Sequence, residues 1–296
     1  MQRFLLYLAL ILATIFWSIS YIWYKVIYEA YTPAIVLFFR LLIASLFLVF
    51  FSAVMRKLQK LRKGDVYWFL LMAFFEPLLY FTGESFGMLY VSATVGAVII
   101  SMIPVFVPLI MLIFYKQKIV LINLLGVLVS IAGVYMVLVN EQMALTASVK
   151  GMLFMFLAVA AALGYTVLLH RMVAKYNAYT IITWQNVFAA VYFIPVFLLS
   201  DFQLFISTPV DVSAFLRIAG LAVFASSLAY IFYAEGVKRL GATKATVFTN
   251  LVPVSTAVLA YYILNERLAY INIGGIVLVI VGLFLSQVNR RLWRWR

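Results

Sequence analysis

The chain of 296 residues has no cysteine and a single histidine, His170. Without cysteine there is no disulfide framework and no thiolate metal site, and one imidazole cannot build a histidine metal cluster. We therefore predict no bound metal and no cofactor. The chain also lacks a Gly-x4-Gly-Lys-Ser/Thr phosphate-binding loop, so we expect that it does not hydrolyse ATP.

Charged side chains are scarce as well. They make up 10% of the residues, hydrophobic side chains make up 67%, and the mean hydropathy is +1.13. Soluble domains carry about 25% charged residues, so this composition favours a protein whose outer surface faces lipid. The net charge of +13 would indicate a nucleic-acid partner in a soluble protein. In an apolar chain the placement of the charges decides, and we expect no nucleic acid.

Long apolar runs separated by polar breaks occupy most of the chain. About 20 apolar residues cross the hydrocarbon core as a helix, and a helix satisfies its own backbone hydrogen bonds within lipid. The first run lacks a small-residue cleavage pattern, which favours a span over a signal peptide. The sequence predicts an all-α integral membrane protein with ten transmembrane helices, at residues 4–24, 34–55, 66–87, 93–115, 120–139, 150–170, 179–199, 214–235, 243–264 and 269–288.

Basic residues fall mainly on one side of these spans. If the N-terminus is cytoplasmic, 17 Lys and Arg lie in cytoplasmic segments and 4 in external ones, with Arg40 inside a span. Cytoplasmic segments of membrane proteins carry such an excess. We therefore expect a multi-pass protein of the cell inner membrane with both termini in the cytoplasm. Its basic face would meet anionic headgroups, and residues 290–296 would act as an anchor there.

The two halves of the chain resemble each other. A shift of 145 residues places Arg40 on Gln185, and a shift of 149 aligns the later spans: Ala93 with Ala242, Pro104 with Pro253, Lys118 with Arg267, Asn123 with Asn272, Gly126 with Gly275 and Gly133 with Gly282. Each copy holds five spans, an odd number, so the second copy enters the membrane from the opposite side. The sequence predicts two inverted five-helix repeats, residues 1–142 and 148–296, in one transmembrane domain, an architecture typical of secondary transporters.

These positions also carry a family resemblance across essentially the whole chain. It rests on Trp17-Ser18, Arg40, Pro104-Val105 with Gly126 and Gly133, and Pro253-Val254 with Asn265-Glu266-Arg267, Gly275 and Gly282. In these features the chain resembles the ten-span EamA-type branch of the drug/metabolite transporter superfamily. The resemblance implies an inner-membrane exporter of metabolites, amino acids or drugs, with a central cavity walled by spans 1, 3, 4, 6, 8 and 9. One departure is Gln117-Lys118, where the family has Glu before the basic residue; it puts an ion pair at this position in doubt.

Ionisable side chains inside spans are costly and therefore candidates for function. Glu76, Tyr80 and Glu84 share one face of the third span, because they are spaced by four residues. Pro77 is expected to bend the helix beside Glu76. A carboxylate there could bind an amine or carry a proton, and Glu76 and Glu84 are the proton-coupling candidates. The alternatives are one interhelical hydrogen bond for Glu76 and an ion pair with Arg40 for Glu84.

Aromatic and small polar residues complete the predicted binding site. The aromatic candidates Trp17, Tyr21, Tyr80, Tyr165 and Tyr230 could enclose an apolar or cationic solute; ordinary packing is the alternative for each. Ser101 and Asn250 correspond in the two copies and precede Pro104 and Pro253 by three residues. We expect them at bends that expose backbone groups to a solute, or in ordinary interhelical hydrogen bonds. A gating or proton role for His170 competes with simple solvation at the interface.

The sequence as a whole favours a secondary transporter, an exporter of small metabolites, amino acids or drug-like solutes that works by alternating access. Protons are the candidate coupling ion, and the sequence assigns no oligomeric state. A membrane receptor or structural protein is the first alternative. An integral-membrane enzyme is the second, but the chain has neither a His cluster nor loops long enough for a soluble active site, so we predict that it is not an enzyme.

Overall fold

The computed structural model describes residues 2–139, 145 and 147–286, and the predicted anchor at 290–296 lies outside them. Over the described residues the chain is helical and forms no strand beyond one isolated bridge between Val139 and Leu145. Nine helical segments of 18 to 29 described residues are long and apolar enough to cross a membrane, and a tenth has 17. The predicted all-α membrane fold is confirmed.

The first repeat contains five spans. They are formed in order by α1 (Gln2–Ile27); α2 (Pro33–Val54); η1 (Lys63–Asp65), α3 (Val66–Ala73), η2 (Phe74–Leu79) and α4 (Tyr80–Met88); α5 (Ala93–Ile100) and α6 (Met102–Tyr115); and α7 (Leu121–Leu138).

The second repeat follows the same order. Its spans are formed by α8 (Val149–Met172); α9 (Ala178–Ser200); α11 (Val212–Gly220), η3 (Leu221–Leu228) and α12 (Ala229–Leu240); α13 (Ala242–Ala245), η4 (Phe248–Leu251) and α14 (Val252–Leu264); and α15 (Tyr270–Ser286). The short helix α10 (Phe202–Ser207) occupies the longer connection after α9. The predicted boundaries agree to within a few residues, the eighth span running on to Leu240 rather than to residue 235.

The spans that are interrupted correspond in the two repeats. Spans 3 and 8 each contain a π-helical segment, η2 and η3. Spans 4 and 9 are broken at Ser101 and at the 3-10 segment η4, just before Pro104 and Pro253. At η2 the backbone of Glu76 leaves the helical region, with φ −148° and ψ 119°, next to Pro77, which has no N–H to continue the ladder. The predicted bend beside Glu76 is therefore present, and Ser101 and Asn250 lie where the regular helix is interrupted, as predicted.

The last spans of the two repeats, α7 and α15, lie side by side and run antiparallel. The Asn123 side chain, near the start of α7, donates to the carbonyls of Leu285 and Ser286 at the end of α15, at 3.2 and 2.9 Å. Asn272, near the start of α15, donates to carbonyls at the end of α7, including that of Val137 at 3.2 Å. Because Asn123 and Asn272 correspond in the repeats, this reciprocity requires the repeats to be inverted.

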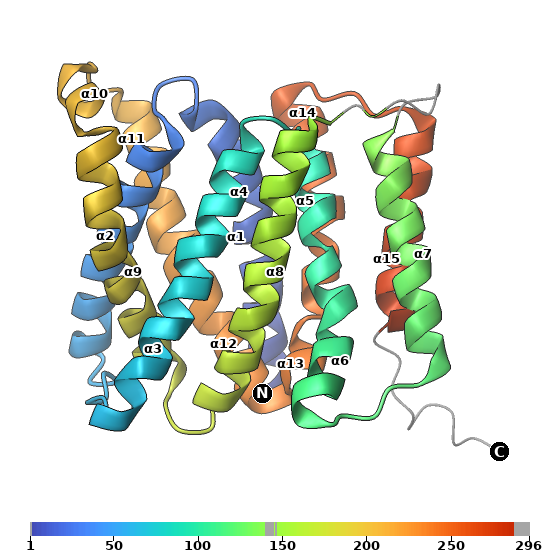
Figure 1. Ribbon diagram of the computed structural model, residues 1–296, viewed down its shortest axis with the longest axis horizontal. Helices are drawn as coiled ribbons and strands as arrows, with labels where there is room; N and C mark the ends of the chain where they lie inside the picture. Colours follow the sequence, from blue (N-terminus) through green and yellow to red (C-terminus); the bar gives the residue numbers. More distant parts are fainter. Residues whose placement is uncertain (1, 140–144, 146, 287–296) are drawn as a thin grey trace.

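Glycine allows α7 and α15 to approach this closely. A Cβ added to Gly126 would lie 2.2 Å from the backbone nitrogen of Ser286, and one added to Gly282 would lie 2.5 Å from that of Ser130. These are distances that no side chain tolerates, so the aligned glycines found in the sequence are packing positions. Figure 1 shows this helix pair at one edge of the molecule, apart from the helices that surround the centre.

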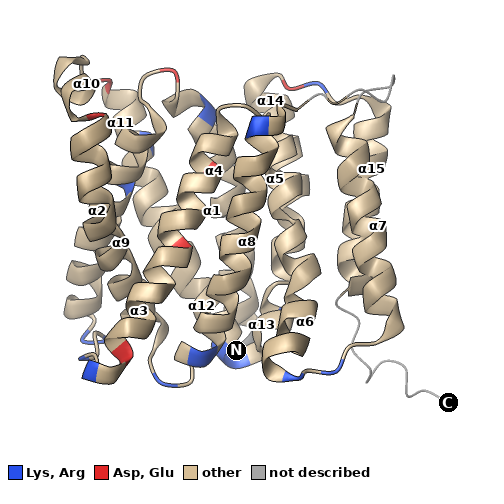
Figure 2. Cartoon of the chain, viewed as in Figure 1, with Lys and Arg blue, Asp and Glu red and all other residues tan. Residues whose placement is uncertain are grey.

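Two ends of the helix bundle can be distinguished. We call the end where α1 begins and α2 ends the lower end, and the opposite one, where α1 ends and α2 begins, the upper end, as they are seen in Figure 1. Lys and Arg gather mainly at the lower end, whereas Asp and Glu are more frequent in the connections of the upper end (Figure 2).

Candidate functional site

A cavity lies among the central helices, midway along the spans. Its wall comes from α1, η2, α4, α5, α6, α8, α12, η4 and α14, and from Arg40 of α2. The six spans expected from the family resemblance therefore all contribute. Arg40 adds the second span to the wall, because its long side chain reaches inward between α1 and η3.

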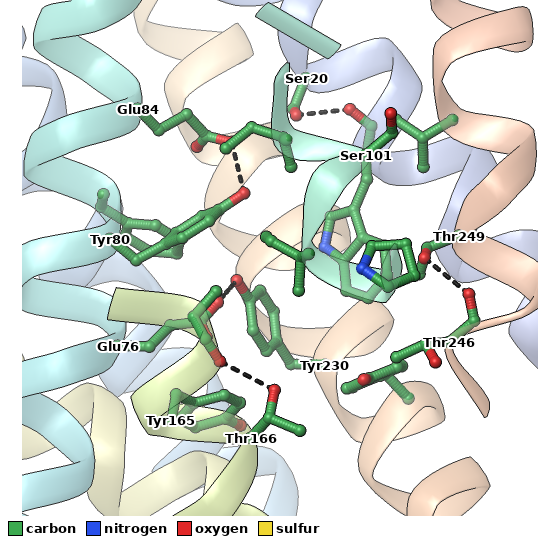
Figure 3. Close-up of a pocket in the computed structure, with 18 of the residues that line it drawn as sticks. Ser20, Glu76, Tyr80, Glu84, Ser101, Tyr165, Thr166, Tyr230, Thr246 and Thr249 are labelled. Atoms are coloured by element: carbon green, nitrogen blue, oxygen red, sulfur yellow. Dashed lines mark hydrogen bonds between the residues drawn. The ribbon is translucent and has the colours of Figure 1, made fainter. Parts of the chain in front are cut away.

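Eight of the nine predicted site residues line this cavity: Trp17, Tyr21, Glu76, Tyr80, Glu84, Ser101, Tyr165 and Tyr230. Figure 3 shows Glu84 and Tyr80 above Glu76 and Tyr230, all on the side walls of one space. The shared helix face predicted for Glu76, Tyr80 and Glu84 is thus present, although Glu76 itself lies outside regular helix. That these residues bind a solute stays a prediction.

Asn250 is the exception. It is buried, but the cavity is lined instead by Thr246 and Thr249 from the same stretch of chain. The local geometry gives the reason. Residues 248–251 form a 3-10 helix, in which positions three apart lie on the same side; Thr246 and Thr249 share the cavity side, and the next residue points away. Ser101, its counterpart, ends a regular α-helix and does reach the cavity.

The upper part of the cavity is charged. Arg40 and Glu84 form an ion pair at 3.6 Å, with their side chains 2% and 5% exposed. The Glu84 carboxylate also accepts hydrogen bonds from the hydroxyls of Tyr80 at 2.9 Å and Tyr24 at 3.1 Å. The ion pair that the sequence left as an alternative for Glu84 is confirmed, so both its oxygens are already engaged.

Arg40 ties this network to two further spans. Its guanidinium donates to the Tyr24 hydroxyl and, at 2.6 Å, to the hydroxyl of Ser226 in η3. It also lies 3.8 Å from the centre of the Phe81 ring, a cation–π distance. Spans 1, 2, 3 and 8 therefore meet at one satisfied charge cluster, which is how a charge becomes tolerable at this depth.

The Glu76 carboxylate has a different environment. It is 5% exposed and accepts a hydrogen bond from the Tyr230 hydroxyl of α12. Among the described residues no Lys, Arg or His forms a salt bridge with it. Nearby, Tyr165 donates to Gln185 at 3.1 Å. A buried acid with a neutral partner retains capacity to accept a further donor or to hold a proton.

Aromatic rings complete the wall around Glu76. Trp17 packs edge-to-face against Tyr230 and Tyr233, with ring centres 5.4 and 5.6 Å apart. Its indole N–H donates to the carbonyl of Ala225 at 3.2 Å, a backbone group in the π-helical segment η3. The rings thus pack on one another, as the alternative interpretation held, and they also face the cavity, where their π-faces would suit an organic cation.

Several cavity residues were not found from the sequence: Ser20, Phe81, Ile100, Ile103, Pro104, Ala162, Thr166, Tyr233, Thr246, Thr249 and Val252. An alignment of the two repeats could have identified many of them. With a shift of 145 or 149 residues, the lining residues pair as Trp17 with Ala162, Ser20 with Tyr165, Tyr21 with Thr166, Phe81 with Tyr230, Glu84 with Tyr233, Ile100 with Thr249 and Ile103 with Val252. The cavity therefore lies on the axis that relates the repeats.

The site offers hydrogen bonds, one ion pair, the Glu76 carboxylate and π-faces. Among the residues that the structure describes, no group of three or more His, Asp or Glu side chains is placed to hold a metal.

Comparisons with known proteins agree with this architecture. The EamA-like transporter family matches residues 4–139 and 149–287, one segment in each half. An uncharacterized transporter of Archaeoglobus fulgidus is 27% identical over 287 residues, 96% of this chain and 98% of its own length. The uncharacterized transporter YetK of Bacillus subtilis is 26% identical over 85% of this chain and 77% of its own. A protein of known crystal structure shares the fold, with a TM-score of 0.73, 14% identity, and coverage of 96% of this chain and 97% of that one.

Proposed function

Because the chain belongs to the EamA-like transporter family, we propose that it is a secondary transporter that moves a small solute across the cell inner membrane by alternating access. The observation that carries this proposal is the position of the cavity, on the axis between two inverted repeats and lined by corresponding residues of both. Inverted repeats can exchange conformations, so a site on their axis can face either side of the membrane in turn.

The solute is expected to carry a positively charged amino group. Arg40 and Glu84 neutralise each other, which leaves Glu76 as the acid of the cavity without a basic partner among the described residues. An ammonium group would find a carboxylate acceptor there and the ring faces of Trp17 and Tyr230 beside it. Beside a neutral, purely apolar solute, an ionised Glu76 would be a buried charge compensated only by the Tyr230 hydroxyl, which is costly.

The same carboxylate can serve the coupling ion. A buried acid binds either a proton or an ammonium group, but one excludes the other, since each neutralises the same charge. If Glu76 takes up a proton on one side and exchanges it for the solute on the other, the inward proton gradient drives the solute outward. This arrangement makes the transporter an exporter and needs no second ion site.

The lower end is expected to face the cytoplasm, with both termini, because basic residues gather there (Figure 2). Anionic headgroups of the inner leaflet would then lie against it. Single cysteines in this cysteine-free chain test the orientation. We expect K60C, in the connection after α2, to react with a membrane-impermeant maleimide from the cytoplasmic side, and I206C of α10 from the external side. Reaction of both from one side would contradict the orientation.

Transport is tested in liposomes that contain the purified protein and an internal pH dye. A panel of primary amines, zwitterionic amino acids, sugars and nucleosides is added outside under a pH gradient. We expect proton movement with members of the amine or amino-acid groups and none with sugars. E76Q should abolish this movement while the protein purifies normally, because an amide can neither ionise nor pair with an ammonium group.

The control variant is E235Q, an acid of α12 that pairs with Arg239 at 2.5 Å near the lower end and does not line the cavity. It should transport at the parental rate. Proton movement that persists unchanged in E76Q would remove Glu76 from the mechanism, and the absence of movement with every solute class would contradict proton-coupled transport itself.

A further inference from the structure

The upper end of the cavity is fastened by two polar contacts between spans. The Lys25 ammonium at the end of α1 donates to the backbone carbonyls of Met88 and Val91, where α4 turns toward α5. The Glu266 carboxylate, after α14, accepts a long hydrogen bond of 3.5 Å from the backbone N–H of Thr94 in α5. We call these residues the upper latch.

Each member of the upper latch has a counterpart at the lower end. The shift of 145 residues that relates α1 to α8 places Lys25 on His170. The shift of 149 that relates the later spans places Glu266 on Gln117, and it places Met88, Val91 and Thr94 on Val237, Leu240 and Thr243. Both polar residues of the latch are thus replaced by polar residues, His170 and Gln117. Thr94, whose N–H is bonded, is matched by another threonine.

The lower counterparts are not joined in this structure. The Nδ1 atom of His170 is buried without a hydrogen-bond partner among the described residues, and the ring packs edge-to-face on Tyr115 at 4.6 Å. Gln117 is exposed, and Thr243 is partly exposed whereas Thr94 is fully buried. At the level of helices, α1 packs against α5, whereas α8 makes few contacts with α13, the counterpart of the first half of α5. The upper latch is therefore formed in this structure, and its lower counterpart is not.

We propose that His170 and Gln117 are gating residues that form a lower latch when the transporter turns its cavity to the upper side. In that state a ring N–H of His170 donates to the carbonyl of Val237 or Leu240 at the end of α12. The side-chain oxygen of Gln117 accepts from the backbone N–H of Thr243. The proposal rests on the proposed alternating access, because it describes the second of its two end states.

The two latches differ in strength, and this difference gives the transporter a preferred resting state. Hydrogen bonds from an ammonium group or to a carboxylate are roughly twice as strong as neutral ones. The upper latch has two hydrogen bonds from an ammonium group and one to a carboxylate, whereas the lower latch pairs a glutamine and an imidazole with backbone groups. The state with a closed upper end and an open lower end is therefore favoured at rest. With the lower end in the cytoplasm, the cavity at rest is accessible from the cytoplasm, the side on which an exporter binds its solute.

The test uses one reporter thiol, I103C, in the cavity wall of the cysteine-free chain. A membrane-impermeant maleimide is applied to sealed vesicles of either orientation, and the labelling rate from each side is compared. With no further change we expect faster labelling from the lower side. Adding H170K and Q117E gives the lower end the same residues as the upper latch. This should slow labelling from the lower side by about tenfold, the effect of about 1.4 kcal/mol, and speed it from the upper side.

Two matched variants separate the possible failures. K25H with E266Q gives the upper latch the residues of the lower end and should shift labelling in the same direction, toward the upper side. Q203E, an exposed change in α10, should alter neither rate. If the upper variant shifts the labelling and H170K with Q117E does not, the lower latch is refuted and alternating access stands. If neither variant changes access to the reporter, neither latch sets the balance of the two states and the gating proposal is refuted, whereas alternating access is decided by the transport assay above.

A second measurement covers the case in which the latch variants fold poorly. A bifunctional maleimide should link K25C and V91C readily, because the Lys25 side chain spans the gap between α1 and the Val91 carbonyl and the linker replaces its length. It should link H170C and L240C more slowly, at a rate that rises with K25H and E266Q. A lower cross-link that never forms, in protein whose upper pair is linked, would overturn the proposal.

Discussion

The upper and lower halves of the cavity have the same helical frame but different chemistry. In the upper half Arg40 and Glu84 form a buried ion pair. In the lower half the corresponding positions are Gln185 and Tyr233, and Gln185 accepts a neutral hydrogen bond from Tyr165. The comparison teaches that the repeat determines where a cavity residue lies, whereas a few diverged positions determine its charge. An inverted repeat can therefore keep its symmetric motion while its binding site becomes polarised along the transport path.

The largest expected effect comes from breaking the ion pair of the upper half. R40Q should lower the free energy of unfolding by about 3–5 kcal/mol, because it leaves the Glu84 carboxylate buried without a cation. R40Q combined with E84Q removes both charges of the pair, so that these positions are neutral like their counterparts Gln185 and Tyr233, and should recover most of that loss. Thermal unfolding of the purified variants in one detergent ranks their stabilities.

A surface ion pair provides the control for this prediction. R239Q removes the partner of Glu235, but the Arg239 side chain is 50% exposed, so the loss should be about 0–1 kcal/mol. If R40Q is no more destabilising than R239Q, or if the double variant is less stable than R40Q alone, the buried pair does not hold the upper half together.

A smaller effect compares one tyrosine hydroxyl in each half. Y80F removes a hydrogen bond to the Glu84 carboxylate, and Y165F removes one to the neutral Gln185. Bonds to charged groups contribute about 1.5–3 kcal/mol and neutral ones about 0.5–1.5 kcal/mol. Y80F should therefore lower the unfolding temperature more than Y165F. Equal shifts would show that the charge of Glu84 adds nothing to its bond with Tyr80.

Much of the frame could be predicted from the sequence because lipid imposes simple requirements. Ten apolar runs predicted the spans, and the register of Asn123 with Asn272 and of Gly126 with Gly275 predicted the inverted repeats. Glu76 and Glu84 stood out because acids are rare in such runs. In each case a strong physical cost limits which residues a position accepts, so the pattern is readable without coordinates.

The rest of the site was hidden because its residues are ordinary ones. Tyr24, which joins Arg40 to Glu84, is one of 19 tyrosines, and nothing in its local sequence separates it from those that merely pack. Thr249 lines the cavity in place of the predicted Asn250, because a 3-10 segment replaces an α-helix there. A change of helical pitch over four residues leaves no periodic signal in the sequence. Which hydroxyl faces a cavity is decided by packing between distant spans.

The smallest effect is expected where the two repeats are the same. N123L and N272L each remove a side chain that bonds its own helix start and the end of the partner helix. Each loss should amount to about 1–2 kcal/mol, and the two should be nearly equal, unlike the changes in the cavity. Q203L on the exposed helix α10 is the neutral control.

The double variant N123L with N272L shows whether the two asparagine contacts stabilise the pair α7 and α15 independently or cooperatively. The two asparagines lie near opposite ends of the helix pair, and 17 residues of α15 span about 25 Å. Changes that far apart should be additive, so the double variant should lose the sum of the two single losses. A loss well above that sum would mean that freeing both ends lets the helices separate along the glycine contact between them. A marked inequality between the single variants would mean that the repeats have diverged at this edge as they have in the cavity.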